Sequence, residues 1–100
     1  MAEIIVGTIE DIPEGSAKMV TAGDREIAVF NVEGEFFAIS NTCPHRGGPL
    51  SEGSVDGCVV SCPLHNWQFN VQTGQCLISS NIKVPTYKVE VRDDQIILIA

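Results

Sequence analysis

Cys43-Pro44-His45 and Cys62-Pro63-Leu64-His65 are the two stretches that decide how this chain folds and what it binds. Each stretch pairs a cysteine with a histidine, and each has a proline directly after the cysteine. Sixteen residues separate the two motifs. Thiolates and imidazoles are common ligands of iron, zinc and copper in proteins. Two such pairs on two short loops therefore predict one metal site to which both loops contribute.

Outside the two loops, which span residues 41–50 and 62–67, most of the chain has the pattern of short β-strands separated by Gly, Pro, Asn and Asp. Hairpin turns are predicted at Val32–Phe36 and Arg92–Gln95, and only Ile9–Pro13 suggests a helical turn. The predicted strands are Ile4–Thr8, Ala17–Thr21, Glu26–Val32, Phe36–Ser40, Cys58–Ser61, Gln68–Val71, Thr86–Arg92 and Gln95–Ile99. The pattern predicts an all-β fold, a sandwich or barrel-like body.

The length and charge of the chain limit the classes of function. One hundred residues, 44% of them apolar, suffice for one modest core, so a single domain over residues 1–100 is expected. Thirteen acids against six bases give a formal net charge of −7. Since no run of Lys or Arg is present, nucleic acid and membrane are not expected as partners. An acidic surface favours a partner with a basic docking face.

The first residues and the cysteines suggest a cellular location. Residues 1–7 lack the pattern of a signal peptide, and no apolar run approaches the roughly 20 residues that span a bilayer. We therefore expect a soluble cytoplasmic protein with reduced thiols. Cys58 and Cys76 allow either a disulfide or two buried free thiols, and the second interpretation is favoured because free Cys behaves as a small hydrophobe.

The motifs, and much of the chain around them, resemble the Rieske-type 2Fe–2S ferredoxin family. That family includes soluble Rieske ferredoxins and the Rieske-type small subunit of assimilatory nitrite reductase. Three further stretches are similar to it: Asp11-Ile12-Pro13-Glu14-Gly15, Ile27–Val32 and Thr86–Val91. The resemblance implies the Rieske fold, with an antiparallel β-sandwich base and a small cluster-binding subdomain, about residues 41–77, that carries two ligand loops. It also implies one 2Fe–2S cluster per chain.

The resemblance assigns the ligands. Cys43 and Cys62 are expected to bind one iron as thiolates, and His45 and His65 the other as imidazoles. Because two neutral rings replace two thiolates, such a site is less negative than a four-cysteine cluster. Its reduction potential is therefore higher, roughly −150 to +300 mV against about −400 mV.

Residues beside the ligands are expected to shape the site. Gly47 and Gly48 allow close backbone approach to a bridging sulfide, and Pro49 restricts the first loop. Three apolar side chains are expected to form a collar around the cluster: Leu50, Leu64 and Trp67.

High-potential members of the family carry an additional cysteine in each loop, at positions occupied here by Gly48 and Leu64. They also carry Ser and Tyr hydroxyls that bond cluster sulfurs, where this chain has Trp67 and Phe69. Fewer hydrogen bonds to sulfur stabilise the reduced cluster less. The chain is therefore expected to be a low-potential centre.

Three functions are compatible with these residues. The first is a ferredoxin that passes single electrons from a flavin-dependent reductase to a terminal oxidoreductase, such as a ring-hydroxylating dioxygenase. The second is the small subunit of an NAD(P)H-dependent nitrite reductase, which would stay bound to its large subunit. The ligand loops resemble those of this small subunit more closely than those of dioxygenase ferredoxins. The third is a zinc-stabilised interaction module, although the spacing fits zinc ribbons poorly. No catalytic nucleophile or base is evident outside the site, so we expect an electron carrier rather than an enzyme.

Overall fold

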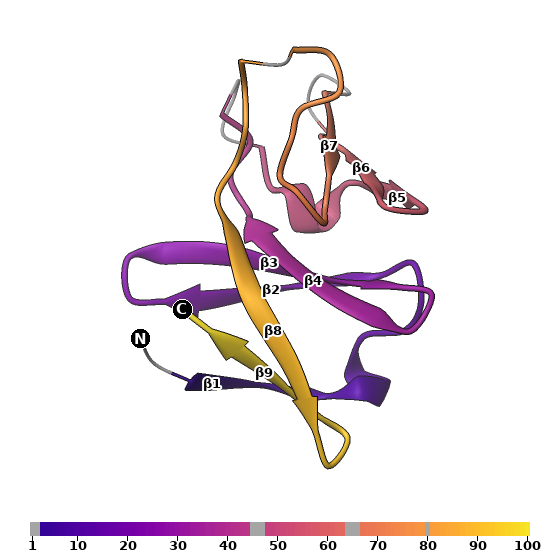
Figure 1. Ribbon diagram of the computed structural model, residues 1–100, viewed down its shortest axis with the longest axis vertical. Coiled ribbons are helices and arrows are strands. Elements are labelled where there is room, and N and C mark those ends of the chain that lie inside the picture. The colour runs from indigo at the N-terminus through magenta and orange to yellow at the C-terminus, as the bar shows by residue number, and fades with distance from the viewer. Residues whose placement is uncertain (1–2, 45–47, 64–66, 80) are drawn as a thin grey trace.

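The computed structural model describes residues 3–44, 48–63, 67–79 and 81–100. Within them the regular elements are antiparallel strands and two short 3-10 turns (Figure 1). The elements, in chain order, are β1 (Glu3–Thr8), η1 (Ile9–Asp11), β2 (Ala17–Ala22), β3 (Arg25–Val32), β4 (Glu35–Ser40), η2 (Leu50–Glu52), β5 (Ser54–Asp56), β6 (Val59–Ser61), β7 (Gln68–Asn70), β8 (Thr86–Arg92) and β9 (Gln95–Ile99).

Six strands form the base of the molecule in the order β1-β9-β8-β4-β3-β2. Strands β4 and β8 pair at only two positions, Ala38↔Tyr87 and Ile39↔Thr86, so the sheet bends there into two halves that face each other. The Lys18 ammonium of β2 donates to the Val6 carbonyl of β1 over 3.0 Å and links the two edge strands. The base is therefore barrel-like, around a core of Val6, Ile12, Ile27, Val29, Ala38, Ile96 and Leu98.

The chain between β4 and β8, residues 41–85, forms a second unit that we call the small subdomain. It contains the sheet β5-β6-β7, which two isolated bridges extend, Phe69↔Cys76 and Gln75↔Lys83. In Figure 1 it stands at one end of the molecule, above the base. Its apolar side chains pack with Ala28, Phe30 and Val32 of β3 in a second core.

Strand β3 therefore contributes to both cores. Its residues Ile27 and Val29 belong to the core of the base, and the alternate residues Ala28 and Phe30 to the core of the small subdomain. This explains why all six residues from Ile27 to Val32 are buried, since alternating side chains on a strand point to opposite faces. The small subdomain is thus fixed to the base by one strand whose side chains belong to both cores.

The hairpin turns are confirmed where they were predicted. Glu33 and Gly34 join Val32 to Glu35 with φ of 52° and 90°, and Asp93 and Asp94 join β8 to β9 with φ of 50° and 64°. Two successive residues of positive φ match the right-handed twist of a hairpin. The helical turn expected at Ile9–Pro13 is the 3-10 turn η1.

All eight predicted strands are confirmed to within one residue at each end. The sequence pattern missed β5, because Ser-Val-Asp is too short to show an alternation and contributes one half-buried side chain. The expected all-β fold, with an antiparallel base and a small loop-bearing unit, is confirmed.

Candidate metal centre

The first candidate loop begins where β4 ends. The Cys43 side chain is 1% exposed, and the Cys43 N–H donates to the Gly48 carbonyl over 2.9 Å. Thr42 and Pro49 form a bridge immediately outside this hydrogen bond. The chain thus leaves the sheet at Cys43 and returns at Gly48, which closes the loop at its base. His45 belongs to this loop by sequence and lies outside the described residues.

Asn41 anchors the first loop. Its side chain is buried, and its Oδ1 accepts the Ser51 N–H over 2.8 Å. The Asn41 N–H donates to the Glu26 carbonyl of β3, and its own carbonyl accepts the Leu50 N–H over 2.7 Å. A buried amide with these partners fixes the entry and exit of the loop relative to the base.

The second candidate loop joins β6 to β7. The Cys62 side chain is fully buried, and the Cys62 N–H donates to the Trp67 carbonyl over 2.7 Å. The next pair outward, Ser61 and Gln68, is in register in the sheet. His65 lies between these ends by sequence and outside the described residues.

The two loops are closed in the same way. In each, the amide of the cysteine bonds a carbonyl five residues later, and the cysteine side chain is buried while the following proline is exposed. Cys43 and Cys62 also belong to the same buried cluster of side chains. Two thiols thus lie in one apolar core, and each cysteine begins a closed loop that by sequence contains a histidine. This arrangement fits a group that takes sulfur and imidazole ligands.

A third segment, residues 74–84, was not singled out by the sequence. The Leu77 N–H donates to the Gln68 carbonyl over 2.8 Å, and the Cys76 N–H to the Ile82 carbonyl over 3.0 Å. The Gln75 side-chain amide lies 3.0 Å from the carbonyls of Ser79 and Ile82. The signal of this segment in the sequence was Gly74, which was expected to open a turn. In the structure Gly74 has a φ of 77°, and a Cβ there would lie 2.2 Å from the Val84 carbonyl.

The expected neighbours of the ligands are only partly described. Gly47 and Leu64 lie outside the described residues, as do Arg46 and Asn66. Gly48 is buried and accepts the Cys43 hydrogen bond, Pro49 pairs with Thr42, and Trp67 is half-buried against the subdomain core. The expected collar position of Leu50 is wrong: its side chain is fully buried in that core, because η2 packs against β2 and β3.

Cys58 and Cys76 do not form a disulfide, and both carry free thiols. The Cys58 carbonyl accepts the Val71 N–H, whereas Cys76 pairs with Phe69 through an isolated bridge. Cys76 is buried and Cys58 half-buried. The expectation of free thiols is confirmed, although Cys58 is less buried than expected.

Among the described residues, no group of three or more His, Cys, Asp or Glu side chains is gathered, since both histidines fall outside them. Nor does that part of the chain contain a helix long and apolar enough to cross a membrane.

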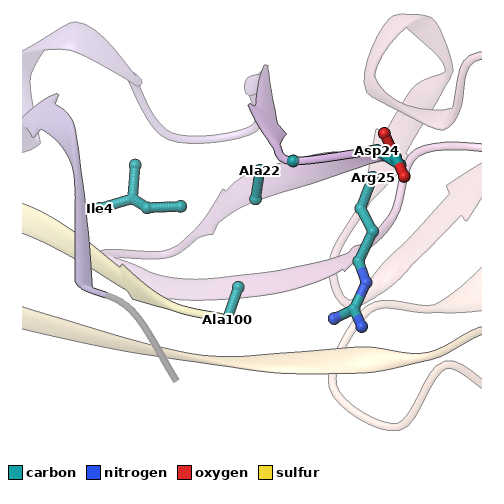
Figure 2. A pocket seen from close by; sticks show the side chains of 6 residues that line it. Ile4, Ala22, Asp24, Arg25 and Ala100 are labelled. Atoms are coloured by element: carbon teal, nitrogen blue, oxygen red, sulfur yellow. The ribbon is translucent and has the colours of Figure 1, made fainter.

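A hollow of about 440 Å³ lies on the base, between the β2–β3 turn and the two chain ends (Figure 2). Its lining includes Ile4, Ala22 and Ala100, with the exposed side chains of Asp24 and Arg25. The Arg25 guanidinium also lies 5.9 Å from the centre of the Tyr87 ring. One acid and one base in an open hollow offer no redox or metal chemistry, so the paired loops remain the candidate site.

Comparison with known proteins identifies the family of this chain. A family model described as the Rieske [2Fe-2S] domain matches residues 2–88. The ferredoxin component of the naphthalene 1,2-dioxygenase/salicylate 5-hydroxylase systems of Ralstonia sp. is 37% identical over 91 residues, which cover 90% of this chain and 88% of that protein. In a complex of reduced oxygenase and oxidised ferredoxin of carbazole 1,9a-dioxygenase, one chain matches with a TM-score of 0.90 and 33% identity, over 96% of this chain and 91% of that one.

A candidate small subunit of NADH-dependent nitrite reductase from Mycobacterium tuberculosis also matches, with a TM-score of 0.90 over 99% of this chain and 96% of its own. Its identity is only 23%, so this likeness concerns the fold alone. The ligand loops were expected to be closer to nitrite reductase subunits, whereas the identity over the whole chain is higher with the dioxygenase ferredoxin component, at 37% against 23%.

Proposed function

The chain belongs to the Rieske [2Fe-2S] domain family, and from that premise we propose that it is the ferredoxin of a ring-hydroxylating dioxygenase system. It receives single electrons from a flavin-dependent reductase and passes them to a terminal oxygenase. The observation that carries the proposal is the pair of identically closed loops, whose buried cysteines enter one core. The identity with a dioxygenase ferredoxin component over most of both chains supports the choice of system.

We propose that Cys43 and Cys62 hold one iron of the cluster and that His45 and His65 hold the other. When bound, a 2Fe–2S group supplies a one-electron redox couple. The two cysteines hold their sulfur atoms away from water, in a core that includes Val60 and Phe69. The two loop-closing hydrogen bonds fix the backbone of each cysteine at the start of its loop. Such fixed ligands limit the rearrangement that accompanies a change of charge.

We propose that the chain is a non-catalytic electron carrier. The proposal is supported by the relatives that it matches over most of their length, which are named as ferredoxin components or subunits of dioxygenase systems. We also propose a cytoplasmic location, which the free thiols of Cys58 and Cys76 support, because oxidising compartments favour disulfides.

A reconstitution assay tests the function. The purified iron-loaded chain is added to the reductase and oxygenase of the Ralstonia naphthalene dioxygenase system, from which the native ferredoxin is left out. Naphthalene oxidation that depends on the added chain is the expected result. If the reduced chain is not reoxidised by the oxygenase, and instead co-purifies with a nitrite reductase large subunit in fixed proportion, the proposed system is wrong and the bound-subunit alternative replaces it.

A further inference from the structure

The charge of the chain is divided very unevenly between its two units. The small subdomain, residues 41–85, contains two acids and two bases, so its formal charge without a cofactor is zero. These four residues are Arg46, Glu52, Asp56 and Lys83. Eleven acids and four bases lie in the rest of the chain, which therefore carries the whole net charge of −7. The acidic surface expected to attract a basic partner is thus a property of the base.

The small subdomain instead presents apolar side chains. Leu77 is 51% exposed and Ile78 59% exposed, and they are adjacent in the chain. Among the described residues, the other large hydrophobic side chains with comparable exposure are on the base: Ile5, Met19 and Val91. Exposed apolar side chains that lie together can form the apolar part of a contact with another protein.

This apolar pair lies directly beside the second ligand loop. The Leu77 N–H donates to the Gln68 carbonyl, and Gln68 follows Trp67, whose carbonyl accepts the Cys62 N–H. Leu77 is therefore joined to the end of the Cys62 loop through one further residue and one hydrogen bond. In Figure 1 the stretch between β7 and β8 runs at the same end of the molecule as β6 and β7.

The segment that carries the pair is held in shape before any partner binds. The Gln75 side chain reaches the carbonyls of Ser79 and Ile82 across the turn, and the Cys76 N–H bonds Ile82. A contact whose backbone is already fixed loses less conformational freedom on binding. Leu77 and Ile78 are thus presented on a fixed turn rather than on a loose loop.

We propose that Leu77 and Ile78 are the apolar contact through which this chain docks on its terminal oxygenase, and that charge contributes little to the affinity. The inference rests on the proposed function, since it names the surface that this partner uses. The complementary surface on the oxygenase is apolar and not strongly basic, because the small subdomain has no net charge to attract a basic one. The acidic base faces away from the contact and disfavours docking through the wrong end.

A direct transfer experiment tests the proposal. Chemically reduced chain is mixed without oxygen with the oxidised oxygenase of the Ralstonia naphthalene dioxygenase system, and the concentration dependence of the rate gives Kd and the limiting rate. Leu77→Ser/Ile78→Ser should raise Kd about tenfold or more and leave the limiting rate unchanged, because two buried aliphatic contacts are lost. Ile5→Ser, at a 63% exposed position on the base, is the matched control and should change Kd less than about twofold.

Salt provides a second readout. Between about 50 and 300 mM ionic strength, the Kd of the unchanged chain should vary less than about threefold. Charged contacts weaken over this range, but apolar contacts do not. A Kd that rises steeply with salt would overturn the proposal, as would a double variant that binds like the unchanged chain. Cluster absorbance and midpoint potential should be the same in all variants.

Other outcomes separate this inference from the proposed function. If the unchanged chain transfers no electron to the oxygenase, the proposed function fails and the docking proposal with it. If the unchanged chain forms dimers in sedimentation and the double variant does not, the apolar pair serves self-association and the docking proposal is wrong, while the proposed function stands.

Discussion

The backbone N–H of Cys62 lies 2.7 Å from the carbonyl oxygen of Trp67, five residues later, and Cys43 stands in the same relationship to Gly48. Each hydrogen bond closes a loop at a buried cysteine: Cys62 directly follows β6, and Cys43 lies three residues beyond the end of β4. The histidines differ in position within the loops, being two residues after Cys43 and three after Cys62. The shared closure makes two loops of different sequence equivalent at their cysteine ends.

The proposed ligands predict a sharp division among the cysteine and histidine variants. His45→Ala and His65→Ala should abolish the rhombic EPR signal of a histidine-ligated 2Fe–2S cluster in the dithionite-reduced protein, and so should Cys43→Ser and Cys62→Ser. Cys58→Ser is the control, because this half-buried thiol lies outside the motifs and should leave the spectrum intact. A full spectrum in either histidine variant, or a colourless chain that contains zinc, would contradict the ligand assignment.

The midpoint potential should lie toward the lower end of the Rieske range, nearer −150 than +300 mV. Trp67 and Phe69 have no hydroxyl to donate to a cluster sulfur, and fewer such donors stabilise the reduced state less. Protein-film voltammetry gives the value. A midpoint above about +100 mV would show that the chain supplies donors other than side-chain hydroxyls.

Gly53→Ala should destabilise the small subdomain. A Cβ at this position would lie 2.0 Å from the Ser61 carbonyl, next to Cys62, so β6 must shift. Such overpacking costs about 3 kcal/mol or more, and we expect a lower Tm and a lower iron content. Gly23→Ala is strained only by its φ of 63°, because a Cβ there meets nothing within 4 Å, so it should cost less and keep its iron. Equal effects of the two substitutions would contradict the steric argument.

Gln75→Ala should loosen the segment that carries Leu77 and Ile78. The substitution removes the hydrogen bonds from the side-chain amide to the Ser79 and Ile82 carbonyls, which costs about 1–3 kcal/mol. Amide hydrogen exchange within residues 76–82 should become faster. Gln72→Ala is the control, since Gln72 is exposed, and exchange in the same segment should then be unchanged.

The ion cluster on the base predicts a pH dependence of stability. The Arg92 guanidinium donates to both carboxylate oxygens of Glu3, over 3.1 and 2.9 Å, and also bonds Glu90. These hydrogen bonds to Arg92 hold the pKa of Glu3 and of Glu90 below the ordinary value of 4.5. The stability that they contribute is therefore complete above pH 4.5 and is lost as the pH falls through the lowered pKa values.

Arg92→Met should accordingly lower Tm slightly at pH 7, and the difference from the unchanged chain should shrink below pH 4.5. Added salt should also reduce the difference, since the cluster is at the surface. Lys83→Met, at an exposed position of the small subdomain, is the control and should produce no such pH-dependent difference. A Tm difference that does not shrink as the pH falls below 4.5 would mean that Arg92 acts through packing instead.

The strands of the base could be predicted because their signals are local. The alternation of β8, the short apolar runs of β3, β4 and β9, and two turns of the Glu-Gly and Asp-Asp type specify these strands without knowledge of their partners. The ligand loops were equally evident, since their chemistry is concentrated in two short motifs.

The missed features depend on contacts between distant parts of the chain. Leu50 ends a Pro- and Gly-rich loop and was expected to form part of a collar around the cluster, but η2 packs on β3 and buries it. In the sequence Gln75 is only a polar residue in a turn, and its hydrogen bonds to the Ser79 and Ile82 carbonyls are evident only in the folded structure. The strand β5 exists because β6 pairs with it, not because its own three residues require it.

The uneven charge of the two units also determines how the molecule should sit on an electrode. All of its net charge is on the base, so the chain is a strong electric dipole whose negative end is far from the ligand loops. An amine-coated electrode should attract the base and leave the ligand loops facing solution. The loops are then open to a partner protein but far from the electrode surface. An uncharged apolar surface should instead adsorb the end that carries Leu77 and Ile78 and exchange electrons with it directly.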